Sequence, residues 1–577
     1  SITSLASTKS IFISEFRRAE NHATKRLFGS RKETAPNMER DFSSLSNPAF
    51  DMLVIGGGAT GAAIAWDATL RGLRVAIIDK SDFSAATSAA SSKLMHGGLR
   101  YLANGEIALV REGLRERRIW GRIATHLVQP LPFVLPTYAP LMQSKWVMGL
   151  GLTAYDLLAF DANRKIDPAQ NMPRHRALTA AQTLGLAPGL AREGLTGGYI
   201  YHDGQMLSPE RLCLSMIRSA VAGGSAAVNY ARADAFTRDE TGLHAVTVRD
   251  MRSRRKTTLR CKTVVNAAGP WADFVMQAAS PAPAPKQIMR SKGIHFVTHD
   301  VTNGAAMAIQ LEDEHLFVLP WQGRTLFATT DTGFTQDPDT VHPDSDDIAA
   351  LLKKVQIALP RLGLTRNDII YAYAGLRPLV ADAGDAPGQT YGMSRGAEIV
   401  DHASQGGPIG LISALGGKWT TCRRLAEQVV DLAYGYVGQS DPGCRTMTEP
   451  LADTPNGPLA RFLEAAQARH SSHAPERVER LVRLYGNRLD DMLATPCAAL
   501  TGDLPAHLAA QTAYAVSQEM AVCLDDVVLR RLTEGQTGEI DETQITAIAD
   551  YMGKQLKWSD AEKKRQIKNL KGHMRIA

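Results

Sequence analysis

A chain of 577 residues is too long for one small hydrophobic core, so it predicts two or three domains. Its 44% hydrophobic and 21% charged residues are typical of a soluble globular protein, and a net charge of +6 is too small at this length to indicate nucleic-acid binding. The six cysteines form no C-x-x-C pair, which argues against a zinc site, an iron–sulfur cluster and a disulfide framework, and we predict no metal. No stretch reaches about 18 consecutive apolar residues, so a transmembrane helix is not predicted.

The first 48 residues differ in composition from the remainder. They are rich in serine and carry eight Lys or Arg residues against five acidic ones. A mitochondrial presequence is poor in acidic residues, so this composition argues against one. We expect residues 1–47 to be a disordered extension, or an upstream mis-assigned start with Met38 as the true initiator.

Residues 50–79 carry the pattern of a dinucleotide-binding βαβ unit. The run Phe-Asp-Met-Leu-Val-Ile predicts a buried parallel strand, residues 62–70 a helix and residues 74–78 a second strand. Gly-Gly-Gly-Ala-Thr-Gly follows the first strand at 56–61, and the second strand ends on Asp79. A G-x-G-x-x-G motif alone is a weak signal, but here strand, glycines, helix, strand and acid complete the fingerprint within about thirty residues.

Each part of this unit has a physical task at a cofactor. Gly56 permits the tight turn, Gly58 lets the backbone approach a pyrophosphate, and Gly61 lets the helix lie close to the strand. The free N–H groups of the helix N-terminus meet the pyrophosphate charge. Asp79 is placed to accept hydrogen bonds from a ribose hydroxyl, and its charge disfavours the 2′-phosphate of NADP.

Residues 81–101 favour FAD over NAD, which shares the fingerprint. A loop of small and hydroxyl-bearing residues can wrap the pyrophosphate and ribityl chain of non-covalently bound FAD. Thr87, Ser88, Ser92 and Lys93 are its candidate donors.

Two later glycine turns support the same cofactor. A strand predicted over residues 263–268 leads into Gly269, the usual return beneath a nucleotide in two-domain flavoproteins. A turn at Gly417 opens a helix predicted over 419–434, and a helix N-terminus there can offset negative charge on a reduced flavin.

Four motifs resemble those of the FAD-dependent glycerol-3-phosphate dehydrogenase family and occur in that family's order. They are Ser-Ser-Lys-Leu-Met-His-Gly-Gly-Leu-Arg-Tyr-Leu at 91–102, Asn-Ala-Ala-Gly-Pro-Trp at 266–271, Gly-Leu-Arg-Pro-Leu at 375–379 and Gly-Gly-Lys-Trp-Thr-Thr at 416–421. The resemblance implies an α/β fold, with a Rossmann-like FAD domain of the glutathione-reductase and amino-acid-oxidase type, a mixed-sheet substrate domain and a C-terminal helical domain. It also implies oxidation of sn-glycerol 3-phosphate to dihydroxyacetone phosphate, with electrons passed to membrane quinone.

The resemblance assigns the cations within and near these motifs to the substrate. A phosphomonoester dianion needs several fixed cations, and by analogy Arg100, Tyr101, Arg395 and Lys418 would contact it. Arg377 would lie beside the reacting C2 hydroxyl and polarise the alkoxide that forms as hydride leaves for flavin N5.

A general base must lie within hydrogen-bond reach of that hydroxyl. His96 is the first candidate because imidazole accepts a proton near neutral pH, and a flavin contact is its competing role. His295 is the second candidate and a predicted substrate contact. The Thr-Thr-Asp run at 329–331 would border the substrate cavity or form a strand-end turn.

Other activities remain open at this stage. A related polyol phosphate, such as erythritol phosphate, would use the same cations. An amine or amino-acid oxidase would instead need one carboxylate-clamping Arg, so the several cations count against it. A flavin-bearing structural or tRNA-binding protein would need a coherent basic face, which the modest net charge does not offer.

The predicted layout is a discontinuous FAD domain with insertions. Its segments and neighbours are the FAD domain at 48–110, 198–270 and 370–437, a helical or irregular insertion at 111–197, the substrate domain at 271–369 and the helical domain at 445–577. In this last domain, helices are predicted at 459–469, 476–485, 507–520 and 525–531.

Two segments are candidates for contact with a lipid surface. Residues 145–152 combine Trp and Lys with apolar residues, and the tail at 563–571 is basic. A core-packed helix and a solvated tail are the alternatives. The quinone chemistry of the family favours a cytoplasmic protein attached peripherally to the inner membrane, mitochondrial if the source is eukaryotic, and it allows a homodimer.

Overall fold

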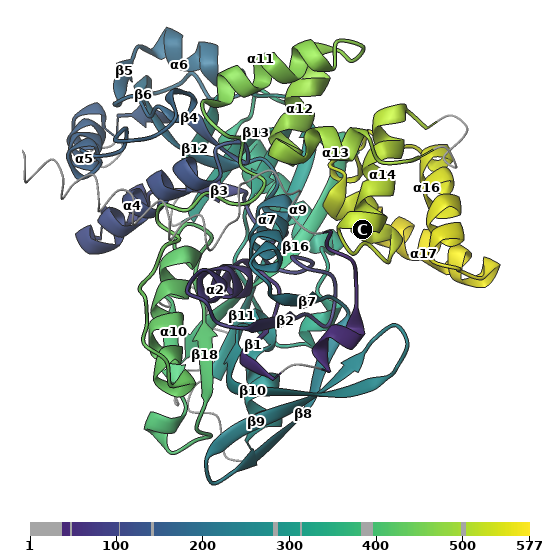
Figure 1. Ribbon diagram of the computed structural model, residues 1–577. Helices are drawn as coiled ribbons and strands as arrows, with labels where there is room; N and C mark the ends of the chain where they lie inside the picture. The colour runs from purple at the N-terminus through teal and green to yellow at the C-terminus, as the bar shows by residue number, and fades with distance from the viewer. Residues whose placement is uncertain are drawn as a thin grey trace, which may run out of the picture. The chain divides into compact units, whose positions relative to one another are not determined.

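The predicted βαβ unit lies at the centre of the first of two sheets (Figure 1). β1 (Phe50–Ile55), α2 (Ala59–Leu70) and β2 (Val75–Ile78) follow one another, and the two strands pair in parallel. Both strands are buried throughout, as is usual when both faces of a parallel sheet are covered. The computed structural model describes residues 37–46, 49–102, 104–139, 144–280, 287–311, 314–381, 396–497 and 504–576.

The first sheet has the strand order β17-β18-β10-β1-β2-β7, and β9 and β8 continue from β10. β18, β10, β1, β2 and β7 run parallel, whereas β17 is antiparallel to β18. β8 and β9 form an antiparallel hairpin, at the bottom of Figure 1, and β9 also pairs with the first half of β10. These strands are β7 (Ala226–Val228), β8 (Ala231–Asp239), β9 (Gly242–Asp250), β10 (Lys256–Asn266), β17 (Glu398–Asp401) and β18 (Leu411–Leu415).

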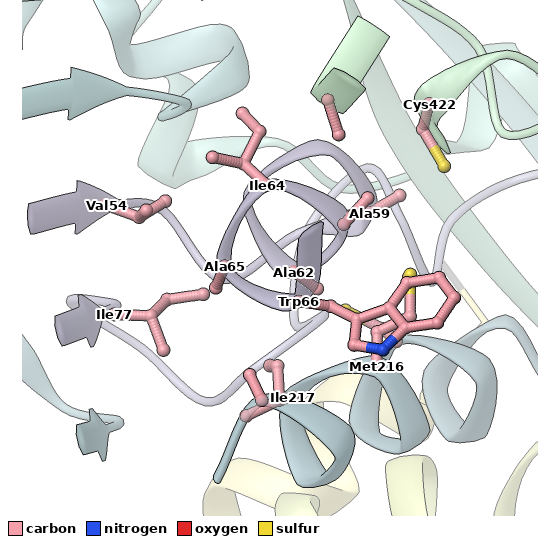
Figure 2. Close-up of a cluster of buried hydrophobic side chains, with 14 of the residues drawn as sticks. Val54, Ala59, Ala62, Ile64, Ala65, Trp66, Ile77, Met216, Ile217 and Cys422 are labelled. Atoms are coloured by element: carbon pink, nitrogen blue, oxygen red, sulfur yellow. The ribbon is translucent and has the colours of Figure 1, made fainter. Parts of the chain in front are cut away.

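One face of this sheet is covered by α2, α7 (Pro209–Ala222) and α10 (Cys422–Val437). Five buried alanines of α2 keep its surface small and allow close packing: Ala59, Ala62, Ala63, Ala65 and Ala68. Figure 2 shows Trp66 of α2 beside Met216 of α7, with Val54 and Ile77 on the neighbouring strands. The other face packs against the β8–β9 hairpin and α8 (Ala272–Ala279).

The second sheet is mixed and has the order β15-β11-β14-β13-β12-β4-β6-β3, with β16 paired to β11 and β5 to β6. Only β12 and β4 pair in parallel among the pairs described in this sheet. Its strands are β3 (Leu94–Met95), β4 (Val128–Tyr138), β5 (Arg176–Leu178), β6 (Leu195–Met206), β11 (Gln287–His299), β12 (Ala306–Leu311), β13 (Glu314–Trp321), β14 (Arg324–Ala328), β15 (Thr332–Phe334) and β16 (Ile369–Ala381). α9 (Ser345–Ala358) packs on one of its faces.

The C-terminal region is helical and shares a hydrophobic cluster with the second sheet. Its elements, several of them drawn in yellow in Figure 1, are α11 (Leu459–Arg469), α12 (Pro475–Tyr485), α13 (Leu489–Leu493), α14 (Ala506–Gln518), the π-helix η9 (Asp526–Arg531), α15 (Glu534–Thr537), α16 (Glu542–Gln555) and α17 (Asp560–Met574). The four predicted C-terminal helices are therefore present, within two residues of the predicted limits. The predicted class is confirmed: α/β, with a mixed second sheet and a helical C-terminal region.

Two segments differ from the predicted layout. Part of the predicted extension is folded, because Met38 is fully buried and bridges to Glu519, and Phe42–Leu45 form a short 3-10 helix. The insertion at 111–197 contains β4, β5 and the start of β6 besides its helices, α4 (Ile107–Ile123), α5 (Lys145–Leu158) and α6 (Ala180–Leu186). It contributes strands because its apolar residues complete the second sheet. In the described ranges, no helix is both long and apolar enough to cross a membrane.

Candidate functional site

A cavity of about 440 Å³ lies at the carboxyl end of β1. The predicted cofactor residues that line it are Gly56, Gly58, Asp79, Thr87, Ser88, Gly269 and Gly417. They come from the βαβ unit, the hydroxyl-rich loop and both later glycine turns, so the fold gathers four separate sequence signals around one space. This is the edge of a parallel sheet at which nucleotides bind.

The glycines are required by close backbone approaches. A Cβ on Gly56, whose φ is +109°, would lie 2.4 Å from the carbonyl oxygen of Ala267. A Cβ on Gly61 would lie 1.8 Å from the carbonyl oxygen of Gly56, so only glycine allows α2 to rest against the turn. Gly58 caps α2 without a side-chain hydrogen bond, and Ser88 Oγ accepts the next amide, that of Ala59. The cradle thus suits a pyrophosphate at a helix N-terminus.

Asp79 provides the acidic end of this cradle. Its Oδ2 accepts the Gly57 N–H at 2.7 Å and its Oδ1 accepts the Ser81 N–H at 2.8 Å. Both carboxylate oxygens keep a lone pair for a ribose hydroxyl. Burial raises the pKa of Asp79 to about 6, although the two amides favour the ionised form. These residues fit the adenosine and pyrophosphate portions of FAD.

The loop that follows, residues 87–96, is hydrogen-bonded to two other parts of the chain. Thr87 Oγ1 donates to the Leu376 carbonyl, and Trp419 Nε1 donates to the Ser88 carbonyl at 3.0 Å. Thr420 Oγ1 donates to the His96 carbonyl. The motifs around Arg377 and Lys418 therefore meet this loop, although they are hundreds of residues away in sequence.

Arg100, Tyr101, Lys418 and His96 are brought together. Arg100 Nη2 donates to Tyr101 Oη at 2.8 Å, and Lys418 Nζ lies 4.2 Å from the centre of the Tyr101 ring. Among the residues that the structure describes, neither Arg100 nor Lys418 has a carboxylate at ion-pair distance. Burial acts to raise the pKa of Tyr101, but the two cations outweigh it and hold that pKa below its ordinary value. The local potential is therefore positive and suits an anion.

A second cavity, of about 400 Å³, is lined by His96, Tyr101 and Lys418, and Lys418 lines the first cavity as well. Burial, helped by Arg100 and Lys418 and opposed by Asp203, lowers the pKa of His96 to about 4. The imidazole is neutral near pH 7 and can accept a proton.

Arg377 lies on β16, opposite Ser291 of β11. Its guanidinium donates to Ser291 Oγ at 3.0 Å, to Thr329 Oγ1 at 2.8 Å and to the Thr330 carbonyl at 2.9 Å. Asp331 lies 3.9 Å away. The predicted Thr-Thr-Asp run therefore borders Arg377 and fixes the orientation of its planar group.

His295 lies on β11, the strand that carries Ser291, and is close enough to Arg377 to be affected by its charge. It stacks on Tyr373 with 4.8 Å between ring centres, and its Nε2 is 3.1 Å from Ser92 Oγ. Burial, with Arg377 and Lys93 nearby, lowers the pKa of His295 well below its ordinary value. His295 lines neither of the two cavities described.

Ser92 and Lys93 line neither cavity, although we predicted both as cofactor contacts. Lys93 has a φ of +56° and a fully buried side chain. Its ammonium lies 3.6 Å from Glu210 Oε1 and 4.6 Å from the centre of the Trp321 ring. Arg395, a predicted phosphate contact, lies outside the described residues.

The sequence did not identify several buried acids that contact the candidate site. Asp203 of β6, only 2% exposed, accepts the Gly97 N–H at 2.8 Å and a hydrogen bond from Arg117 at 2.7 Å. Glu210 faces Lys93, and Asp82 lines the first cavity. Asp203 and Glu210 lie outside the motifs identified in the sequence, and Asp82 lies in the hydroxyl-rich loop without a local signal for its partners.

Comparison with protein families gives two matches that together cover most of the chain. Residues 51–423 match the family described as FAD dependent oxidoreductase. Residues 444–563 match the C-terminal domain of alpha-glycerophosphate oxidase.

Curated relatives and a solved structure match along nearly their whole length. The glycerol-3-phosphate dehydrogenase of Synechocystis sp. is 34% identical over 93% of this chain and 98% of its own. The aerobic glycerol-3-phosphate dehydrogenase of Bacillus subtilis is 29% identical over 92% and 96%. The structure of the glycerol-3-phosphate dehydrogenase from Bacillus halodurans complexed with FAD aligns with a TM-score of 0.74 and 28% identity, over 92% of this chain and 96% of that chain.

Proposed function

Because the chain belongs to the family of FAD-dependent glycerol-3-phosphate dehydrogenases, we propose that it oxidises sn-glycerol 3-phosphate to dihydroxyacetone phosphate. Its cofactor is FAD. The observation that carries the proposed substrate is the cluster of Arg100, Tyr101 and Lys418, part of which lines a cavity next to the cofactor cavity.

This cluster can bind the phosphate group of the substrate. A phosphate dianion would neutralise the positive potential that lowers the pKa of Tyr101, and would accept charge-assisted hydrogen bonds from Arg100 and Lys418. An amino-acid carboxylate would need fewer cations, so the cluster favours the phosphate ester.

Oxidation removes a hydride from C2 of the substrate and a proton from its C2 hydroxyl, which leaves the carbonyl of dihydroxyacetone phosphate. FAD, when bound, supplies the hydride acceptor at N5. Arg377 stabilises the developing alkoxide, since Ser291 and Thr329 hold its guanidinium in one orientation. His96 takes the proton; both histidines are neutral near pH 7, but His96, unlike His295, lines the cavity that contains Tyr101 and Lys418.

We also propose membrane quinone as the final electron acceptor, with peripheral attachment to the inner membrane through α5. In support, Trp146 is 90% exposed, and Leu150, Leu157 and Phe160 are more than 70% exposed on and just beyond this helix. An apolar face of this kind suits insertion into a lipid interface. The large hydrophobic residues exposed in the described part of the chain include none from α17, so α5 is the stronger of the two predicted lipid contacts.

Anaerobic mixing of the holoenzyme with glycerol 3-phosphate tests the substrate. The absorbance bands of oxidised flavin should bleach, and Arg377→Ala should prevent bleaching while FAD stays bound. Arg249→Ala is the matched control, since Arg249 pairs with Asp234 on the β8–β9 hairpin. Bleaching by another polyol phosphate but not by glycerol 3-phosphate would contradict the proposed substrate, and loss of FAD from the Arg377 variant would contradict the role given to that residue.

A further inference from the structure

A buried acid joins the cofactor cavity to the C-terminal helices. Asp82 follows Asp79 by three positions, is 1% exposed and is among the residues that line the first cavity. Its carboxylate accepts four hydrogen bonds, from Asn229 at 2.9 Å, from Arg530 at 2.8 Å and from Arg531 at 2.7 and 2.9 Å. Burial opposes the ionised form, but the two arginines outweigh it and lower the pKa of Asp82.

Both arginines belong to η9, and the C-terminal region holds them in place. Arg530 also donates to Asp526, which accepts a 2.6 Å hydrogen bond from Tyr230 Oη. Arg531 donates to the Glu519 carbonyl at 2.8 Å. The two guanidinium groups are therefore fixed by contacts made outside the cofactor cavity.

The segment that contains Asp82 also contacts the glycine turn. The Ser84 N–H donates to the Gly57 carbonyl at 3.0 Å, and Asp79 accepts the Gly57 N–H. Phe83 packs so closely that a Cβ on Gly57 would lie 2.3 Å from its ring. Residues 79–84 thus form one wall of the cavity, anchored on one side by the glycine turn and on the other by η9.

We propose that Arg530 and Arg531 are positioning residues for FAD, and that the C-terminal helical region retains the cofactor by holding Asp82 and the 79–84 wall in their binding geometry. The contact lies between regions that match two separate families, so cofactor retention depends on the association of both. The inference rests on FAD as the cofactor and is independent of the substrate.

A merely structural ion pair would behave differently. If the ion pairs between Asp82 and the two arginines only stabilised the fold, their loss would lower the unfolding temperature equally with and without FAD. If these ion pairs instead shape the cavity, their loss must also lower the affinity for FAD. The rise in unfolding temperature caused by a fixed FAD concentration must then shrink, because that rise depends on the ratio of ligand concentration to Kd.

The test compares FAD release from full-length holoenzyme variants by the recovery of flavin fluorescence on serial dilution. Asp82→Asn should raise the Kd for FAD at least about ten-fold, since it weakens charge-assisted hydrogen bonds to both arginines. Arg530→Gln removes one of the hydrogen bonds to Asp82, together with the bond to Asp526, from a partly exposed side chain, leaves Arg531 in place and should raise the Kd by roughly three- to ten-fold. Should Asp82→Asn fail to fold, Arg530→Gln decides the question.

Arg218→Gln is the control. Arg218, on α7, is more deeply buried than Arg530 and pairs with Asp453 and Glu519, so it also joins the two regions but lines neither cavity. It should lower the unfolding temperature while the Kd for FAD and the FAD-induced temperature shift stay at wild-type values. An unchanged Kd in Arg530→Gln, or an equal rise in Arg218→Gln, would overturn the proposal.

Discussion

Replacing Asp203 by Asn should impair flavin reduction without releasing FAD. The Asp203 carboxylate holds the turn after His96 by accepting the Gly97 N–H, and it pairs with Arg117, whose side chain is 3% exposed. Asn keeps the size of the side chain and one acceptor oxygen, but removes the charge. The buried guanidinium then loses its counter-ion, and the hydrogen bond from the Gly97 N–H is weakened because its acceptor is no longer charged.

The expected loss of rate follows from the two hydrogen bonds that Asp203 accepts, from the Gly97 N–H and from Arg117. A hydrogen bond to a charged group contributes about 1.5–3 kcal/mol. If that free energy is lost from the alignment of His96, the second-order rate constant for flavin reduction falls roughly 10- to 150-fold. Asp203 also acts to raise the pKa of His96, so the acid limb of the pH–rate profile should move to lower pH in the variant.

Stopped-flow reduction by glycerol 3-phosphate, measured from pH 3 to pH 8 so that the range spans the pKa of His96 at about 4, checks both effects. Asp161→Asn is the control, because Asp161 accepts two 2.9 Å hydrogen bonds from Arg111 on the same helix, α4, but at a more exposed position. Exposed pairs contribute about 0–1 kcal/mol, so this variant should react at close to the wild-type rate. A rate for Asp203→Asn within about two-fold of wild type, with an unmoved acid limb, would refute this reasoning.

Three further predictions concern the cofactor cradle and α5. Gly61→Ala places a Cβ 1.8 Å from a backbone carbonyl oxygen and should abolish FAD retention, whereas Gly151→Ala, with open space around its Cβ, should not; a Gly61 variant that purifies with full flavin content would contradict this. Because burial raises the pKa of Asp79 to about 6, its carboxylate is protonated as the pH falls through 6 and loses acceptor capacity. The Kd for FAD should therefore rise between pH 7 and pH 5, and an equal rise in Asp79→Asn would show that another group titrates. Replacing Trp146 and Leu150 together by Glu should prevent co-sedimentation with anionic lipid vesicles while flavin reduction is retained, and continued sedimentation would exclude α5 as the lipid contact.

Sequence patterns predicted the parts of this fold whose signals are local. The βαβ unit was predictable because strand, glycines, helix and acid lie within one short segment, and the turn glycines are required by backbone approaches that no other residue permits. Helices such as α11 and α12 were predictable from apolar spacing. The strands within 111–197 were not, since β4 and β6 gain their partners only when they pair with each other and with β12.

In the candidate site too, the sequence predicted which residues take part but not where every side chain points. Motifs identified Arg100, Tyr101 and Lys418 as candidates, and the structure brings them together as a cluster. The sequence did not indicate that Lys93 would face Glu210 rather than a cofactor cavity, because a single Lys carries no information about the direction of its side chain.

By itself, then, the sequence determined the cofactor class and the candidate residues, because glycine turns and clustered motifs constrain the backbone locally. Only the tertiary structure decided which buried acids contact the cofactor cavity and the candidate residues. Asp203 anchors the turn after His96, and Asp82 connects η9 to the cofactor cavity. A buried charge is stable only beside partners that satisfy it, and those partners lie on elements that folding alone brings together.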